Sequence, residues 1–180
     1  MRALKALAAA AICAAALAAI YFTAVAPVRW NRAAREAALS LKRADTAPSL
    51  YDAGLIARRV LEETEAFAGP ATHDMRLHFH RAQAWTFVEN HEAAIQHYRL
   101  ALRLDQRPEL YVGLANSLAA TGRREEAVQS ALLAVRFRSI AADNIADGVV
   151  RAEVEEAIAR GRTGCDAQAE AAAASKLGRN

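Results

Sequence analysis

The chain of 180 residues is 54% hydrophobic but only 6% aromatic, and it carries 23 Lys+Arg against 20 Asp+Glu. Abundant alanine, with only eight glycines and four prolines, favours helices and excludes an all-β sandwich or barrel, which needs many turns. Two cysteines, Cys13 and Cys165, are too few for a disulfide scaffold, a zinc cluster or a haem-attachment motif. We therefore predict an all-α fold.

The basic residues are concentrated at the N-terminus. Residues 1–43 hold seven basic side chains and one acidic one, whereas residues 44–180 carry a net charge of −3. A nucleic-acid-binding domain has its basic residues on the folded body, so no nucleic-acid partner is expected. Only three of the basic residues are lysine, which together with the alanine excess indicates a GC-rich bacterial genome.

Residues 6–26 form an uncharged, alanine-rich run. At about 1.5 Å per residue a helix of this length spans roughly 30 Å, the thickness of a bilayer core. A retained membrane anchor and an export signal are both compatible with the run. Residues 24–26 have the small-x-small pattern of a cleavage site, but Pro27 would then occupy the first mature position and obstruct the peptidase. We favour an anchor comprising residues 1–28.

Three arginines, Arg29, Arg32 and Arg35, follow the run at helical spacing and are candidates for contact with lipid phosphates; the alternative is a solvated helix face. The charge count favours a body in the cytoplasm. The short basic lead before the apolar run is typical of export signals and favours a body outside it. We predict a single-pass protein of the bacterial inner membrane with a periplasmic body.

The body contains an internal repeat, in which two segments align at a constant offset that places Ala82 opposite Ala115. Small residues match small ones and large apolar residues match large ones. The first segment contributes Ala82, Trp85, Ala94, Ile95, Ala101, Leu102 and Leu104, and the second Ala115, Leu118, Ala127, Val128, Ala134, Val135 and Phe137. Each segment predicts two helices joined by a tight turn, at residues 89–91 and 121–123 respectively.

This pattern resembles the tetratricopeptide repeat, a helix-turn-helix unit with a period close to the offset seen here. In the second copy residues 114–115 match the Leu-Gly pair of the family and Gly122 matches the turn glycine. The first copy departs at Arg81, where the family has a large apolar residue, and at Glu89, where the glycine is missing. The resemblance covers residues 75–140 and implies a short helical solenoid.

Repeat arrays need about three units to bury a continuous core, so further helices are expected on both sides of the pair. Residues 29–68 predict a juxtamembrane helix pair, a degenerate repeat whose second helix has an apolar stripe starting at Leu50. Residues 141–160 predict a C-terminal capping helix, and residues 161–180 a flexible tail. The predicted fold is thus a transmembrane helix, a TPR-like solenoid and a capping helix.

The sequence contains no convincing arrangement for chemistry. His78 and His80 are two residues apart on a predicted helix, so they point about 200° apart and cannot share an ion; we expect surface and groove histidines. No Ser-His-Asp arrangement, phosphate-binding loop or inward carboxylate pair stands out. We therefore predict no enzymatic activity, no cofactor, no metal site and no small-molecule substrate.

What the resemblance implies is partner binding, because stacked repeats in this family form a concave surface lined by the first helix of each unit. The matching positions are Arg76, Phe79, Gln83, Thr86 and Phe87 in the first unit, and Glu109, Val112, Asn116, Ala119 and Ala120 in the second. The basic cluster with which chaperone-binding members clamp a carboxylate is missing. Phe79 and Phe87 are either anchors for a partner or ordinary core residues.

The predicted function is that of a non-catalytic, membrane-anchored protein-protein interaction module, an adaptor or assembly scaffold. The alternative is a stoichiometric accessory subunit of a large bacterial membrane complex. In that case small residues such as Ala14 and Ala18 would let the span pack against other transmembrane helices.

Overall fold

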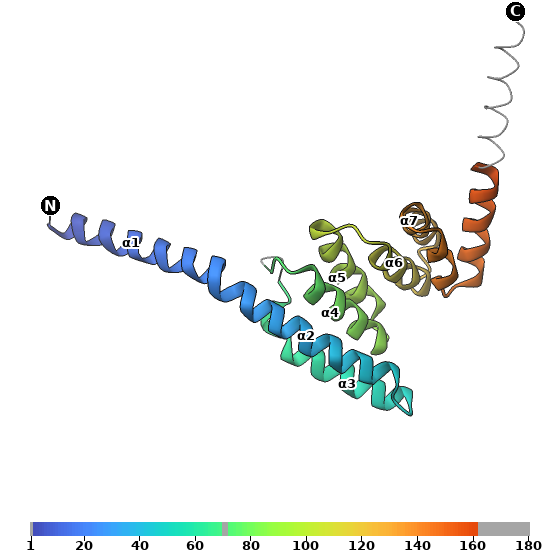
Figure 1. The fold of residues 1–180 in the computed structure, drawn as a ribbon, viewed down its shortest axis with the longest axis horizontal. Helices are drawn as coiled ribbons and strands as arrows, with labels where there is room; N and C mark the ends of the chain where they lie inside the picture. Colours follow the sequence, from blue (N-terminus) through green and yellow to red (C-terminus); the bar gives the residue numbers. More distant parts are fainter. Residues whose placement is uncertain (1, 70–71, 162–180) are drawn as a thin grey trace, which may run out of the picture.

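The computed structural model describes residues 2–69 and 72–161, which form helices and no strand (Figure 1). The predicted all-α class is confirmed for this part of the chain. The flexible tail predicted at 161–180 lies outside the described residues, apart from residue 161. Three hairpins of helices follow one another along the body, and a long N-terminal helix extends away from it.

The N-terminal helix runs without a break from α1 (Arg2–Ile20) through a π-helical turn, η1 (Tyr21–Val25), into α2 (Ala26–Asp45). It includes a segment near the N-terminus that is long and apolar enough to cross a membrane, and almost none of its apolar window is buried in the body. The predicted boundary near residue 28 is therefore no break in structure, since a single helix joins the apolar run to the body.

The leading pair consists of α2 and α3 (Leu50–Glu63), followed by a short 3-10 turn, η2 (Glu65–Phe67). Ser49 begins α3 by accepting a hydrogen bond from the Asp52 backbone N–H. The facing residues are mostly small, which lets the two helices approach closely. They are Ala34, Ala37, Leu41 and Ala44 of α2, and Ala53, Ala57, Val60 and Leu61 of α3.

Two more hairpins follow, formed by α4 (Met75–Phe87) with α5 (His91–Leu104) and by α6 (Pro108–Ala120) with α7 (Arg124–Phe137). Local sequence explains the helix starts. The side chains of Asp74 and Asn90 accept backbone N–H groups at the first turns of α4 and α5, and Pro108 occupies the first turn of α6. One apolar core, which includes Ala94, Ala101, Leu110, Ala115 and Ala127, joins the two hairpins.

The turns of these two hairpins have the same backbone conformation. Gly122 has a φ of 76° and Glu89, at the matching position of the first hairpin, has a φ of 60°. This left-handed region is open to glycine but strained for a residue with a Cβ atom. Glu89 thus adopts the conformation that glycine provides in the second copy.

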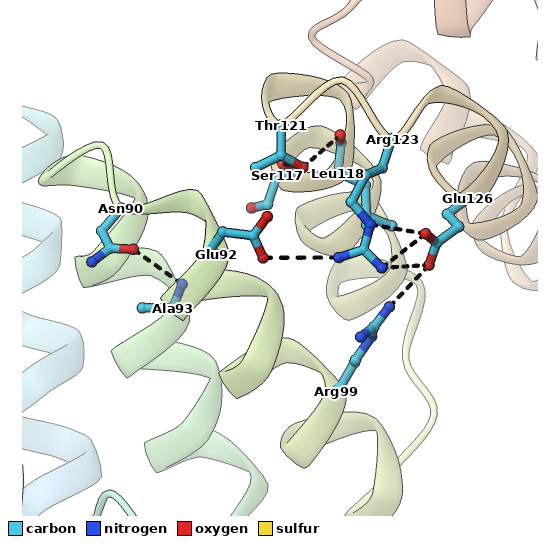
Figure 2. Close-up of polar contacts among 9 residues, drawn as sticks. All are labelled: Asn90, Glu92, Ala93, Arg99, Ser117, Leu118, Thr121, Arg123 and Glu126. Carbon is cyan, nitrogen blue, oxygen red and sulfur yellow. Dashed lines mark hydrogen bonds and ion pairs between the residues drawn. The ribbon is translucent and has the colours of Figure 1, made fainter.

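An ion-pair network links the two turns at the same end of the hairpins. Figure 2 shows Arg123, which precedes α7, reaching Glu92 at the start of α5 at 3.8 Å and Glu126 at 2.8 Å. Arg99 of α5 also contacts Glu126, at 3.0 Å. These groups are partly exposed, so each ion pair contributes at most about 1 kcal/mol to the stability of the fold.

After α7 the chain forms a 3-10 segment, η3 (Ser139–Asn144), and then a helix over residues 148–161. The interval 141–160, predicted as one capping helix, therefore begins in η3 and becomes α-helical only after Asp147. Asp147 starts that helix by accepting the backbone N–H groups of Val149 and Val150, both at 2.9 Å. Val150 is buried in the core of the two hairpins.

Candidate functional site

A groove of about 390 Å³ lies between α4, α6 and η3. Of the residues predicted for a partner-binding surface, Phe79, Gln83, Glu109 and Val112 line it together. They come from the first helix of each hairpin, and the contact between these helices brings matching positions of the two repeats onto one surface. We use the name α4–α6 groove for the surface formed by these four residues together with Ile140, Ala141 and Asn144 of η3.

The floor of the α4–α6 groove is formed by Tyr98 of α5, which lies directly against Gly113 of α6. A Cβ atom at residue 113 would overlap the Tyr98 ring, so this close approach requires glycine. The Tyr98 ring also lies 6.3 Å from the Phe79 ring, centroid to centroid. Burial raises the pKa of Tyr98 to about 12, so the phenol is neutral at physiological pH.

The wall of the groove is η3, and Asn116 holds it in place. The Asn116 side chain donates a hydrogen bond to the Asn144 carbonyl at 3.2 Å and accepts one from the Ala146 N–H at 2.9 Å. Asn116 was predicted to contact a partner, but its amide is engaged within the chain. At the rim, Arg138 pairs with Glu109 at 3.8 Å and Ile140 is 59% exposed. The groove is thus amphipathic, with an apolar floor and a polar edge.

Arg76, another predicted groove residue, connects α4 to α2 instead of lining the α4–α6 groove. Its guanidinium pairs with Asp74 at 2.7 Å and donates a hydrogen bond to the Asn31 Oδ1 atom at 3.1 Å. Burial by itself would raise the pKa of the Asp74 carboxyl, but the Arg76 guanidinium and the backbone N–H groups of Arg76 and Leu77 together lower it. A shallower hollow of about 220 Å³ beside it also contacts Phe79 and Glu109.

Thr86 and Phe87 lie in a different hollow, of about 460 Å³, between α3 and the C-terminal end of α4. Its apolar lining includes Leu50 and Tyr51, which are 87% and 74% exposed. The sequence predicted an apolar stripe of α3 that starts at Leu50, but the buried residues of this helix begin at Ala53 and Leu50 is exposed. Thr86 and Phe87 are thus separated from the predicted residues that line the α4–α6 groove.

A buried polar cluster at Arg81 was not predicted. The Arg81 side chain is 2% exposed and its Nη1 atom donates to the Leu61 carbonyl at 2.9 Å and to the Thr64 hydroxyl at 2.8 Å. Its Nη2 atom contacts Glu65 at 2.9 Å. Leu61 is among the last residues of α3, whose carbonyls have no partner within the helix. Arg81 therefore caps the C-terminus of α3, which gives a structural role to a polar residue where the second copy of the repeat has Leu114.

Two histidines extend this cluster. His78 Nε2 lies 3.1 Å from the Thr72 carbonyl, which only accepts, so His78 carries its proton on Nε2. His78 Nδ1 then accepts from His97 Nδ1 at 3.4 Å, and His97 Nε2 accepts from Arg81 at 3.4 Å. This set of hydrogen bonds requires both imidazole rings, those of His78 and His97, to be neutral. His78 is 1% exposed, which corrects its expected place at the surface.

Burial disfavours the charged form of both rings and lowers their pKa values, for His97 to about 4. The positive charge of Arg81 acts in the same direction. Among the described residues, no group of three His, Cys, Asp or Glu side chains has the arrangement of a metal site. The histidines thus complete a hydrogen-bonded junction between helix pairs.

The three arginines predicted for the membrane surface lie on α2 in different surroundings. Arg29 donates to the Tyr21 hydroxyl at 3.3 Å and lies over the Phe67 ring, 5.7 Å from its centroid. Arg32 pairs with Glu36 at 2.8 Å, and Arg35 is exposed further along the helix. Arg29 is therefore the arginine nearest to the apolar run.

No protein-family model matches the chain, and no curated protein matches its sequence.

Proposed function

We propose that this chain is a non-catalytic, membrane-anchored protein-protein interaction module whose body is a short TPR-like solenoid. The observation that carries the proposal is the α4–α6 groove, which has an apolar floor at Phe79 and a polar rim at Glu109. A surface of this kind suits a helix or extended segment of a partner protein. The apolar N-terminal helix would hold the module at a bacterial inner membrane, with its body in the periplasm.

The absence of enzymatic activity is part of the proposal. Among the described residues, His97 and Tyr98 are titratable groups whose pKa values are strongly shifted by burial. His97 is hydrogen-bonded to other side chains in the buried cluster, and Tyr98 is held neutral under the groove. Neither is arranged beside a nucleophile in a manner that supports acid-base chemistry.

The groove is tested by placing a photo-crosslinking amino acid at Val112 of the full-length protein in native membranes. Gln96, which is exposed on α5, is the matched control position. We expect a discrete adduct from position 112 and none from position 96, and we expect Ile140→Glu at the rim to abolish it. Equal adducts from the two positions, or an adduct indifferent to Ile140→Glu, would contradict the proposed groove.

A stoichiometric accessory subunit of a membrane complex is the second candidate function. It is favoured by the apolar surface at Leu50, Tyr51 and Leu55 of α3, which are 87%, 74% and 48% exposed. Together with a span that the body leaves uncovered, this surface offers contacts to neighbouring proteins over two regions. A permanent complex would bury both the apolar surface of α3 and the apolar N-terminal helix.

A mild-detergent pull-down with intact mass determined on the eluted chain separates the two functions. A subunit is expected to retain residues 1–26, to co-elute with membrane proteins at constant ratio and to be released by Ala14→Leu or Ala18→Leu, because a larger side chain blocks close helix packing. An adaptor is expected to tolerate both substitutions. A chain beginning at Pro27 would instead indicate a cleaved, exported module.

A further inference from the structure

Two described residues of the connection between α3 and α4, Phe67 and His73, lie beside the first turns of α2. Arg29 lies 5.7 Å over the Phe67 ring and Trp30 lies 6.2 Å from the His73 ring. The next residue, Asn31, accepts a hydrogen bond from Arg76 in the first turn of α4. In the folded chain, Phe67, His73 and Arg76 thus lie beside residues 29–31 of α2.

Residues 29–31 and the side chains beside them form a layer, and the position of this layer along the bilayer normal follows from helix geometry. With the uncharged run ending at Ala26, Arg29 lies about 5 Å and Arg35 about 14 Å further along the axis. The headgroup region on each side of a bilayer core is about 5 to 7 Å thick. Burial of α2 against the body begins already at Ala26, which is 1% exposed. The layer of Arg29 therefore falls within the headgroups, and Arg35 falls beyond them.

The composition of the layer fits lipid headgroups. It combines Trp30 and Phe67 with Val28, which is 69% exposed, and aromatic residues favour the membrane interface. Its carboxylates are already paired, since Asp74 binds Arg76 and Glu65 binds Arg81.

Among the ion pairs of the described residues none includes Arg29, which contacts only the uncharged Tyr21 hydroxyl and the Phe67 ring. The layer thus presents one uncompensated cation within aromatic surroundings.

We propose that this layer, formed by residues 28–31 of α2 with Phe67, His73 and Arg76, is a binding surface for anionic phospholipid headgroups, with Arg29 as the residue that contacts the phosphate. It follows that a second segment of the body, remote in sequence from the span, rests on the lipid surface. The inference depends on the proposed membrane anchoring. It assigns no lipid contact to Arg35.

Trp30 provides a native reporter at this layer. In a Trp85→Phe background, the full-length protein is reconstituted into phosphatidylcholine vesicles containing phosphatidylglycerol, with bromine on the chains of one lipid or the other. We expect stronger quenching of Trp30 by brominated phosphatidylglycerol than by brominated phosphatidylcholine. Arg29→Gln should reduce this preference about fivefold, the size expected for one arginine charge at an anionic surface.

Arg29→Lys should preserve the preference, because it keeps the charge, and Arg35→Gln is the matched control that should leave it unchanged. Equal quenching by the two lipids, or equal effects of Arg29→Gln and Arg35→Gln, would overturn the proposal. Vesicle flotation in alkaline carbonate distinguishes failure of the proposed lipid-binding surface from failure of the proposed membrane anchor. A chain that floats without any quenching of Trp30 remains anchored but lacks this surface, whereas a chain that does not float is not anchored at all.

The second segment is tested directly with a nitroxide label at Ala66→Cys, in a background with Cys13→Ser and Cys165→Ser. A label at Asp45→Cys, at the far end of α2, is the control. We expect the label at position 66 to collide more with lipid-soluble oxygen and less with a water-soluble nickel complex than the label at position 45. Equal accessibility of the two labels would show that the connection lies away from the lipid, and would overturn the proposal.

Discussion

The junction between α3 and α4 and the junction between α5 and α6 join successive helix pairs by different means. At the first, Arg81 is buried with His78 and His97 and binds the end of α3. At the second, Leu114 occupies the matching position of the next hairpin, in an apolar core with Tyr98. The same place in a repeated hairpin thus becomes polar where the preceding helix ends against it, because the free carbonyls there need donors.

The largest expected effect comes from removing the polar junction. Arg81→Met should lower the free energy of unfolding by about 3 kcal/mol, because it leaves the Leu61 carbonyl and the Thr64 hydroxyl buried without their charged donor. Leu114→Met at the matching position should lower it by less than about 1.5 kcal/mol. Chemical denaturation of the full chain in mild detergent measures both. Equal losses would mean that the two junctions do not differ in the way described.

The polar junction should also make stability depend on pH. The folded-state pKa of His97, about 4, lies below the ordinary histidine value of 6.5, so the folded state binds fewer protons. The contribution of the neutral His97 ring to the free energy of unfolding is therefore fully present above about pH 6.5 and is lost as the pH falls toward 4. With allowance for partial solvent access we expect a loss of about 2 kcal/mol.

Unfolding midpoints between pH 7 and pH 4 measure this loss, and His97→Asn should make it smaller. The apolar junction has no histidine in its core, so its contribution should not change over this range. A wild-type midpoint that is constant with pH would contradict the assignment of a neutral, buried His97.

The apolar junction is most sensitive to added volume. Gly113→Ala should destabilise the protein by about 1 to 3 kcal/mol, because the new methyl group overlaps the Tyr98 ring. Gly54→Ala is the control, since a Cβ atom there would lie 3.9 Å from the Phe87 carbonyl, an ordinary contact, and should stabilise α3 by about 0.5 to 1 kcal/mol. Thermal unfolding of both variants tests this difference, since the midpoint should fall for Gly113→Ala and rise for Gly54→Ala.

The smallest expected effect concerns the two turns. Glu89→Gly should stabilise the protein by about 1 kcal/mol, because it relieves the left-handed strain at φ 60°. Gly122→Ala should destabilise it by a similar amount, and the absence of any atom within 4 Å of a Cβ there makes the effect purely conformational. If both substitutions destabilise, the Glu89 side chain makes contacts that outweigh its backbone strain.

Sequence periodicity predicted the helical class and the long apolar helix, because both depend on patterns within single segments. It marked Arg81 and Glu89 as departures from the repeat, and these two positions have the structural roles described above. It could not identify the partner of Arg81, since a backbone carbonyl far upstream in the chain has no sequence signal. Membership of the tetratricopeptide family stays a prediction.

The groove was predicted only in part, and the reason is geometric. A pattern of apolar residues tells which side chains share a face of one helix but not how far a neighbouring helix extends over that face. Phe79 and Phe87 share a helix, yet η3 bounds the hollow at Phe79 and α3 bounds the hollow at Phe87. The role of Asn116 depends on η3, whose path the helical periodicity does not specify.

The unbroken helix from α1 to α2 has a mechanical consequence. The 20 residues of α2 extend about 30 Å beyond the apolar run and are packed firmly against α3 and α4. A span that changes its tilt by about 10° to match a thinner or thicker bilayer would swing the far end of α2 through about 5 Å. If the apolar run is anchored as proposed, this continuous helix would couple membrane thickness to the orientation of the body.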